Sequence, residues 1–448
     1  MKFRSFLSTC SATICTATDD TTTLNHPNKS QQPTPNRFFS DTSSNISDTT
    51  SPSFDTSYNS LHSNLSLQTL PSIPSLQKLS PESLHLTVSH RYLTSLTPSP
   101  TAHINFLAVN NNLLYAASGN LIHVFDTTSF TLLDTFCVHD PASGTVKSIT
   151  FRNSPNGNIF TSHQDSKIRV WKLTENKRHK QTGTLPTLED RLLRSFFKNN
   201  YVNVRRHRRR LWIEHHDAVS GLAMINNQLM CSVSWDKCLK IWKTSNLRCV
   251  ESIKAHDDAI NAVVVANDGT IYTGSADRRI KVWGKTESKH VLIATLEKHK
   301  SAVNALALND GGSVLFSGAC DRSILVWEKE YSAGYMAVTG ALRGHSKAIL
   351  CLINVCDLLF SGSADRTVRI WQRGAVGKFC CLGVLDGHKQ PVRSLVADPD
   401  SEVVESKCGS RIKVFSGSFQ GEIKVWKVEV LKMDTPISTP LRKIKLSS

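Results

Sequence analysis

A short pattern that ends in tryptophan recurs along this chain, and it limits the possible folds more than any other feature. Five copies have an Asp six residues before the Trp and a Ser or Thr four residues before that Asp. The copies end at Trp171, Trp242, Trp283, Trp327 and Trp371, as in TGSADRRIKVW. Three consecutive intervals between these tryptophans are 41, 44 and 44 residues, which is the period of one four-stranded propeller blade.

Two weaker copies bring the number of repeats to seven. SGSFQGEIKVW (416–426) has Gln420 in the Asp position, and the first copy (104–125) has Phe125 in the Trp position. Because these are the first and last copies, we expect them to meet. The segment HRYLTSL (90–96) is then expected to add the outer strand of the last blade and to close the ring.

Within each copy, short β-branched runs are joined by Asn, Asp and Gly turns. INAVVVA (260–266), IYTGS (271–275) and RIKVW (279–283) have the apolar runs and alternation of half-buried strands. A single sheet of this size cannot bury both of its faces, whereas sheets stacked around an axis can. The sequence therefore predicts an all-β, seven-bladed propeller over residues 84–428.

Four residue types recur together and are expected to interact across each blade. A buried Asp needs donors, which an imidazole N–H and a hydroxyl can supply while the indole N–H closes the chain. A Ser-His-Asp hydrolase triad is the alternative, but such a triad occurs once per active site. The expected structural tetrads are His139, Thr161, Asp165 and Trp171; His215, Ser232, Asp236 and Trp242; His256, Thr273, Asp277 and Trp283; His299, Ser317, Asp321 and Trp327; and His345, Ser361, Asp365 and Trp371.

This arrangement resembles the structural tetrad of the WD40 family, and the resemblance covers residues 84–428. It implies a seven-bladed β-propeller that works by binding other proteins. The sequence departs from the family pattern after each Trp, where Lys, Gly, Glu or Gln replaces the Asp that gives the family its name.

The chain outside the repeats has a different composition. Residues 1–83 are rich in Ser, Thr, Asn and Pro, which predicts disorder, and residues 429–448 are expected to form a flexible basic tail. Residues 172–208 are expected to be an insertion after the third strand of blade two, with LWIEH as the fourth strand. Within it, TLEDRLLRSFFKNN (187–200) predicts a helix whose apolar face packs on the propeller.

The insertion also concentrates positive charge. The net charge of the chain is +16, and residues 172–214 hold twelve Lys or Arg against four Asp or Glu. Three interpretations of RRHRRR stay open: a solvated strand start, a nuclear localisation signal or acidic-partner patch, and a nucleic-acid contact. The basic patch consists of Arg205, Arg206, Arg208, Arg209 and Arg210.

A closer resemblance is to a plant group of WD40 proteins, the Jingubang-like family. The residues that carry it are LSLQTLPSIPSLQ (65–77) and the long segment 185–223 between the second and third blades. The resemblance implies a regulatory protein in pollen germination and growth control that acts through protein partners and has no catalytic activity.

Partner binding is expected on the face that carries the tetrad His and Asp loops. Trp235 is the leading candidate because Trp and Arg dominate interface energetics; the alternative is that Trp235 only covers an adjacent loop. The candidate positions are Lys147, Ser220, Trp235, Asn261, Asn304, Leu350, Arg393 and Phe419.

Several functional classes are disfavoured by what the sequence lacks. It contains no nucleotide-binding loop, no nucleophile elbow and no Cys/His cluster at zinc spacing, so we expect no enzyme activity, cofactor or metal. No apolar run approaches bilayer length, so no membrane partner is expected. Twelve scattered cysteines favour a reducing compartment, the cytoplasm or nucleus.

The leading functional hypothesis is a monomeric protein-interaction scaffold. A ubiquitin-ligase substrate receptor and an RNA-associated assembly factor remain as alternatives. The first alternative is weakened because no Trp-Asp-x-Arg element follows a strand. The second is weakened because the basic patch has no interleaved aromatic residues on which nucleic-acid bases could stack.

Overall fold

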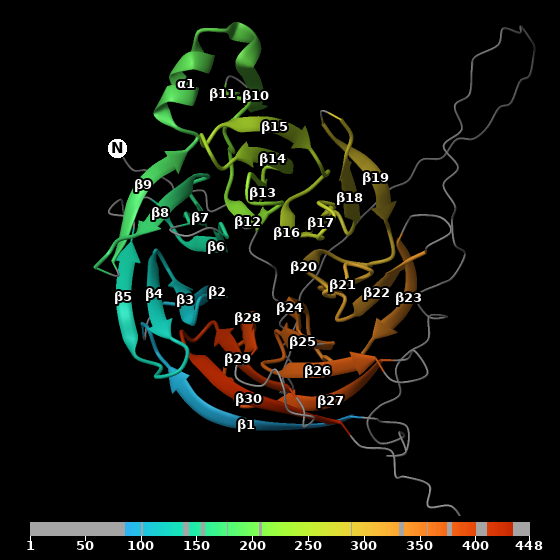
Figure 1. Cartoon of the computed structure of the whole chain (residues 1–448). Helices are drawn as coiled ribbons and strands as arrows, with labels where there is room; N and C mark the ends of the chain where they lie inside the picture. The colour runs from blue at the N-terminus through green and yellow to red at the C-terminus, as the bar shows by residue number, and fades with distance from the viewer. Residues whose placement is uncertain are drawn as a thin grey trace, which may run out of the picture. The chain divides into compact units, whose positions relative to one another are not determined.

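Seven four-stranded antiparallel sheets are arranged radially around one axis in the computed structural model (Figure 1). The chain divides into Met1–Leu65 and Ser66–Ser448, and every described residue belongs to the second unit. The prediction of disorder for residues 1–83 therefore lies outside the described residues. The structure describes residues 86–99, 102–137, 143–153, 157–176, 178–205, 208–287, 289–330, 336–355, 357–373, 379–399 and 410–432.

The strands of the first three blades follow one another from the axis outward. Blade 1 consists of β2 (Ile104–Asn110), β3 (Leu113–Ser118), β4 (Leu121–Asp126) and β5 (Leu132–Cys137). Blade 2 consists of β6 (Val146–Phe151), β7 (Ile159–His163), β8 (Ile168–Leu173) and β9 (His179–Leu185). Blade 3 consists of β12 (Val219–Met224), β13 (Leu229–Ser234), β14 (Cys238–Lys243) and β15 (Cys249–Lys254).

The remaining blades repeat this order, except that the last one takes its outer strand from the start of the propeller. Blade 4 consists of β16 (Ile260–Val265), β17 (Ile271–Ser275), β18 (Ile280–Lys285) and β19 (His290–Leu296). Blade 5 consists of β20 (Val303–Leu308), β21 (Val314–Ala319), β22 (Ile324–Lys329) and β23 (Met336–Leu342). Blade 6 consists of β24 (Ile349–Val355), β25 (Leu358–Ser363), β26 (Val368–Arg373) and β27 (Phe379–Leu385). Blade 7 consists of β28 (Val392–Pro399), β29 (Ser410–Ser418), β30 (Ile423–Lys432) and β1 (Leu86–Leu96).

The ring closes through strand β1, as the sequence predicts. In Figure 1 the blue β1 lies along the red β30, and the two strands pair antiparallel from Leu86 opposite Lys432 to Leu96 opposite Ile423. The last strand therefore runs past residue 428, so the prediction that residues 429–432 belong to a flexible tail is wrong. Pairing between the two ends of the propeller supplies the fourth strand of blade 7 and joins the first and last parts of the ring.

The core lies between the blades. Seven clusters of buried apolar residues each span one interface between neighbouring sheets, including the interface between blades 7 and 1. The second strands are the most buried, as in β17, where all five residues are buried. Outer strands such as β19 are largely exposed.

The glycine in the repeated Thr/Ser-Gly motif is required by this packing. A Cβ added to Gly274 in β17 would lie 2.8 Å from Cγ1 of Val303, the first residue of β20 in the next blade. Contacts this short do not occur without a shift of one partner. Glycine therefore allows the innermost strand of the following blade to approach closely, and Gly318, Gly362 and Gly417 have the same role in blades 5, 6 and 7.

The insertion begins one strand later than the sequence predicts. His179–Leu185 forms β9, which pairs with β8 as the fourth strand of blade 2, so the expectation that LWIEH supplies that strand is wrong. The inserted part consists of α1 (Leu188–Ser195), a 3-10 turn η4 (Lys198–Asn200), and the hairpin β10 (Tyr201–Arg205) and β11 (Arg208–Leu211). The predicted helix is present but ends five residues early.

Candidate interaction site

Four blades contain the complete hydrogen-bonded tetrad. In blade 3, the His215 Nδ1 atom lies 2.7 Å from Asp236 Oδ2, and its Nε2 atom lies 2.8 Å from Ser232 Oγ. The Trp242 indole N–H donates to the same Ser232 oxygen at 2.8 Å. Because Nδ1–H donates to the carboxylate, the Ser232 hydroxyl must donate to Nε2. Blades 4, 5 and 6 have the same contacts among their predicted residues, with distances of 2.7 to 3.0 Å.

The tetrad lowers the pKa of each aspartate despite its burial. Burial alone would raise the pKa of Asp277 and Asp321, but hydrogen bonds and charge from His256 and His299 lower each one to about 2. The aspartates also accept backbone N–H groups, such as Arg279 N to Asp277 Oδ1 at 2.9 Å. These carboxylates are therefore ionised and hold the loops in place.

Blade 2 uses a different set of partners. Trp171 Nε1 donates to Thr161 Oγ1 at 2.9 Å, but the imidazole next to that oxygen belongs to His163, at 2.8 Å. Asp165 forms an ion pair with Arg169, with 2.6 Å between Oδ2 and NH2. The predicted partner His139 lies outside the described residues.

The tetrads have the distances of a hydrolase triad but not its accessibility. Ser232, Thr273, Ser317 and Ser361 are fully buried. Each hydroxyl is already hydrogen-bonded to both an indole and an imidazole. A nucleophile must reach its substrate, so this geometry fits a structural role and not acyl transfer.

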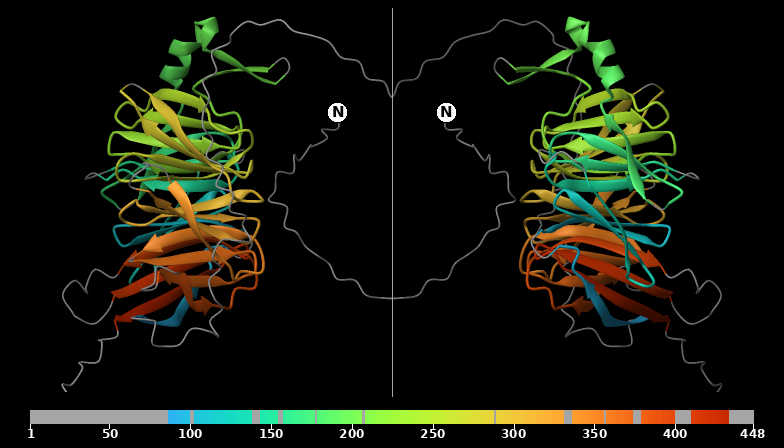
Figure 2. Two further views of the ribbon diagram at one scale, coloured as in Figure 1. Left: turned by 90° about the vertical axis from the view of Figure 1, so that its right-hand side faces the viewer. Right: turned by 90° about the vertical axis from the view of Figure 1, so that its left-hand side faces the viewer.

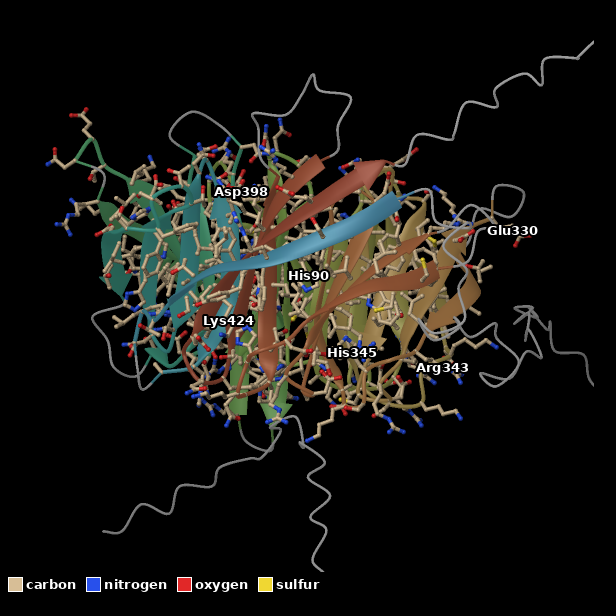
Figure 3. The ribbon with its side chains drawn as sticks, turned by 90° about the horizontal axis from the view of Figure 1, so that it is seen from below. His90, Glu330, Arg343, His345, Asp398 and Lys424 are labelled. Carbon is tan, nitrogen blue, oxygen red and sulfur yellow. The ribbon has the colours of Figure 1, made fainter. Side chains whose placement is uncertain are left out.

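The predicted partner-binding residues gather around the axis. We define the axial ring as the second residue of each innermost strand: Asn105, Lys147, Ser220, Asn261, Asn304, Leu350 and Arg393. Figure 3 shows His345 and Arg343 at one face of the propeller, and Asp398 and Glu330 at the opposite face. Arg393 lies at the start of β28 and Asp398 near its end, so the axial ring is nearer to the face that carries His345. We call this face the tetrad face.

Part of the axial ring is used to join blades. Asn261 Nδ2 donates to the Val303 carbonyl at 3.1 Å, and Asn304 Nδ2 donates to the Ile349 carbonyl at 2.9 Å. Each bond links one blade to the next. The side-chain amides of these two candidates are therefore engaged within the ring, which fits a positioning role better than a contact with a partner.

The two cations of the axial ring have aromatic neighbours. The Lys147 Nζ atom lies 5.1 Å from the centroid of Trp235, and the Arg393 Cζ atom lies 5.4 Å from the centroid of Phe419. All four side chains are half-buried. The sequence named each of these residues, and the structure arranges them as two cation–π pairs.

These two cations have no counter-ion in the part of the chain that the structure describes. Burial, and then the charge of Arg393, lowers the pKa of Lys147 from 10.5 to about 8. Within the described ranges, neither cation forms an ion pair, and the buried Nε atom of Arg393 has no hydrogen-bond partner. Two half-buried cations without a nearby acid destabilise each other's charged form. Binding of an anion at the tetrad face would remove this unfavourable interaction.

The basic patch lies on the inserted hairpin. Arg208 and Arg209 are exposed, and Arg210 NH1 donates to the His215 carbonyl at 3.1 Å. Arg205 pairs with Arg208 through the backbone, and Arg206 lies outside the described residues.

Thiol and metal chemistry have little support in the described part of the chain. Burial raises the pKa of the thiols of Cys231, Cys238, Cys249 and Cys351 to about 12, which keeps them protonated. Among the residues that the structure describes, no group of His, Cys, Asp or Glu has a metal-binding arrangement. No helix of that same part is long and apolar enough to cross a bilayer.

A comparison with known protein families identifies the same repeats that the blades and tetrads define. The model of the WD domain, G-beta repeat, matches residues 130–172, 208–243, 247–284, 290–328, 337–372 and 379–427. These segments together make up more than half of the chain, which therefore belongs to the WD40 repeat family. None of the curated proteins compared matches the chain.

Proposed function

We propose that this propeller is a non-catalytic scaffold that binds an acidic segment of a protein partner on its tetrad face. The observation that carries this proposal is the pair of uncompensated cations, Lys147 and Arg393, held against aromatic rings. A carboxylate between them would supply the missing counter-charge, and Trp235 and Phe419 offer the apolar contact that interface hot spots require.

The wider role follows from the sequence resemblance alone. As a Jingubang-like protein, the chain would act in plant growth or pollen germination control, in the cytoplasm or nucleus. A regulatory scaffold of this kind needs only selective binding, which a rigid ring of blades with a charged axial ring can provide.

The test is quantitative affinity purification from the native cell type, comparing the full-length protein with the double variant Lys147→Gln, Arg393→Gln. We expect proteins recovered with the wild type to be lost with the variant. A synthetic peptide from an acidic segment of such a protein should bind the purified wild type and not the variant. The matched control is Lys285→Gln, Lys289→Gln, two exposed cations of blade 4, which should retain every partner.

Trp235→Ala gives a second measurement on the same site. We expect this variant to fold normally and to bind the acidic peptide more weakly. Loss of soluble protein would instead mean that Trp235 covers a loop. Equal recovery of partners by the wild type and the double variant would overturn the proposal.

A further inference from the structure

The inserted helix α1 carries its apolar residues on the outside. We define the α1 patch as Leu188, Leu192, Leu193, Phe196 and Phe197. Their side chains are 51 to 79% exposed, which makes the sequence-based expectation that this face packs on the propeller wrong. Soluble monomers rarely expose five large apolar side chains together, and such patches mark interaction sites.

Polar contacts hold the opposite face of α1 against the propeller. Within the helix, buried Asp190 accepts from Arg194 Nε at 2.8 Å. The Arg194 guanidinium also donates to the carbonyl of Cys249 in β15 at 3.3 Å and lies 4.5 Å from the ring centroid of Trp212. Arg191 also pairs with Glu214 at 2.8 Å. The helix cannot turn its apolar face inward without breaking these contacts, so the α1 patch is a fixed part of the surface.

The end of the helix adds a further anchor for this orientation. The Asn200 side chain donates to the Arg194 carbonyl at 2.9 Å and accepts from the Trp212 indole N–H at 3.3 Å. The Tyr201 hydroxyl donates to the Ser195 carbonyl at 3.2 Å. The patch and the hairpin that follows it are thus joined in one rigid insertion.

Exposed cations accompany the patch. Lys198 follows it directly, and Arg208 and Arg209 lie on the hairpin β10–β11. Figure 2 shows that α1 and the hairpin project from the same edge of the propeller, leaning to opposite sides. The apolar and the cationic side chains thus both belong to the inserted part of the chain that projects from this edge.

We propose that this insertion docks the propeller on an anionic lipid surface. Large apolar side chains beside Lys and Arg are the combination that binds membrane interfaces, and each signal alone gives only weak attachment. Each side chain of the patch is more than half exposed, so it is available to enter the boundary between lipid headgroups and acyl chains. The docking is peripheral and revises the expectation, drawn from the lack of a spanning segment, that no membrane is involved.

The test is flotation of the purified full-length protein with vesicles. Vesicles of phosphatidylcholine containing about one third phosphatidylserine should bind the wild type more tightly than pure phosphatidylcholine vesicles, and added salt should weaken the binding. Phe196→Ser with Phe197→Ser should lower the partition coefficient roughly tenfold or more. Arg208→Glu with Arg209→Glu should lower binding to the anionic vesicles only.

The matched control is Leu292→Ser with Ile293→Ser, two exposed apolar residues of the outer strand of blade 4, and it should bind as the wild type does. Unchanged near-ultraviolet circular dichroism would show that each variant is folded. The proposal is overturned by equal vesicle binding of wild type and the Phe variant. It is also overturned if the patch drives dimerisation measured by light scattering, or if the protein binds a short single-stranded RNA and not the vesicles.

Discussion

Each tetrad hydroxyl makes two hydrogen bonds inside the core. In blade 5 the Ser317 Oγ atom lies 2.8 Å from both His299 Nε2 and Trp327 Nε1. Both partners are buried, so removal of the hydroxyl leaves two polar nitrogens without a partner. An unsatisfied buried polar group costs about 1–3 kcal/mol.

Ser317→Ala is therefore expected to lower the free energy of unfolding by about 2 kcal/mol or more. The measurement is urea denaturation followed by tryptophan fluorescence. Ser346→Ala, at an exposed position of blade 6, is the control and should change stability by less than about 0.5 kcal/mol. Equal stability of Ser317→Ala and wild type would contradict the structural role of the tetrad.

His163 in blade 2 makes the stability of the folded protein depend on pH. Burial, and then the charge of Arg169, lowers its pKa from 6.5 to about 3. The folded protein therefore keeps this imidazole neutral while the unfolded chain takes up a proton below pH 6.5. Because the unfolded state then binds more protons, stability falls as the pH falls from 6.5 towards 3.

When the pH falls from 7 to 5, this residue is expected to lower the free energy of unfolding by about 2 kcal/mol. His163→Gln should remove that contribution, so its loss of stability over the same interval should be smaller than that of the wild type. Urea unfolding at the two pH values measures both losses. The same loss in both proteins would show that His163 is not held neutral.

At the scale of the strand, glycine positions set how closely neighbouring blades approach. Gly274→Ala places a Cβ against Val303 of the next blade and is expected to destabilise the protein by roughly 1–3 kcal/mol through overpacking. Val303→Ala in the same chain should recover part of that loss, because it removes the clashing methyl groups. Thermal unfolding of the two single variants and the double variant measures the coupling. Additive losses would mean that the two residues do not touch.

The elements that the sequence predicts well are those with a strong apolar pattern. The second strands and the Trp-containing third strands are largely buried, as in β13 and β14, so their apolar residues identify them. The fourth strand of blade 2 was not predicted, because an outer strand buries only a few residues: of HKQTGTL, only Leu185 is fully buried. LWIEH has a more strand-like composition than HKQTGTL, but its first residue, Leu211, ends the inserted hairpin and the other four follow it.

The orientation of α1 could not be read from its amphipathic pattern. Periodicity shows that one face is apolar but does not say against what that face lies. Here Arg194, held by Asp190 of the same helix, anchors the polar face through contacts with Cys249 of blade 3 and with Trp212. The axial ring is a similar case, because only the structure shows that the Asn261 amide bonds to the next blade, whereas Lys147 and Arg393 have aromatic neighbours and no counter-ion among the described residues.

At the scale of the whole propeller, the central feature is closure. Seven apolar interfaces form a continuous ring, and the interface between blades 7 and 1 depends on chain ends that are far apart in sequence. A closed ring gives the tetrad face its rigidity, which is what a scaffold with a fixed axial ring needs. It also leaves the insertion between blades 2 and 3 free to carry a separate surface without disturbing the blades.

The direct measurement of closure is a disulfide between the first and last strands. Ser89 of β1 lies opposite Glu429 of β30, and cross-strand neighbours at this spacing can form a disulfide. Ser89→Cys with Glu429→Cys should yield a linked peptide in a non-reducing digest and raise the unfolding midpoint, while Ser89→Cys with Lys285→Cys should yield none. A chain in which the first pair stays unlinked, or in which both pairs link equally, would contradict the closed seven-bladed ring.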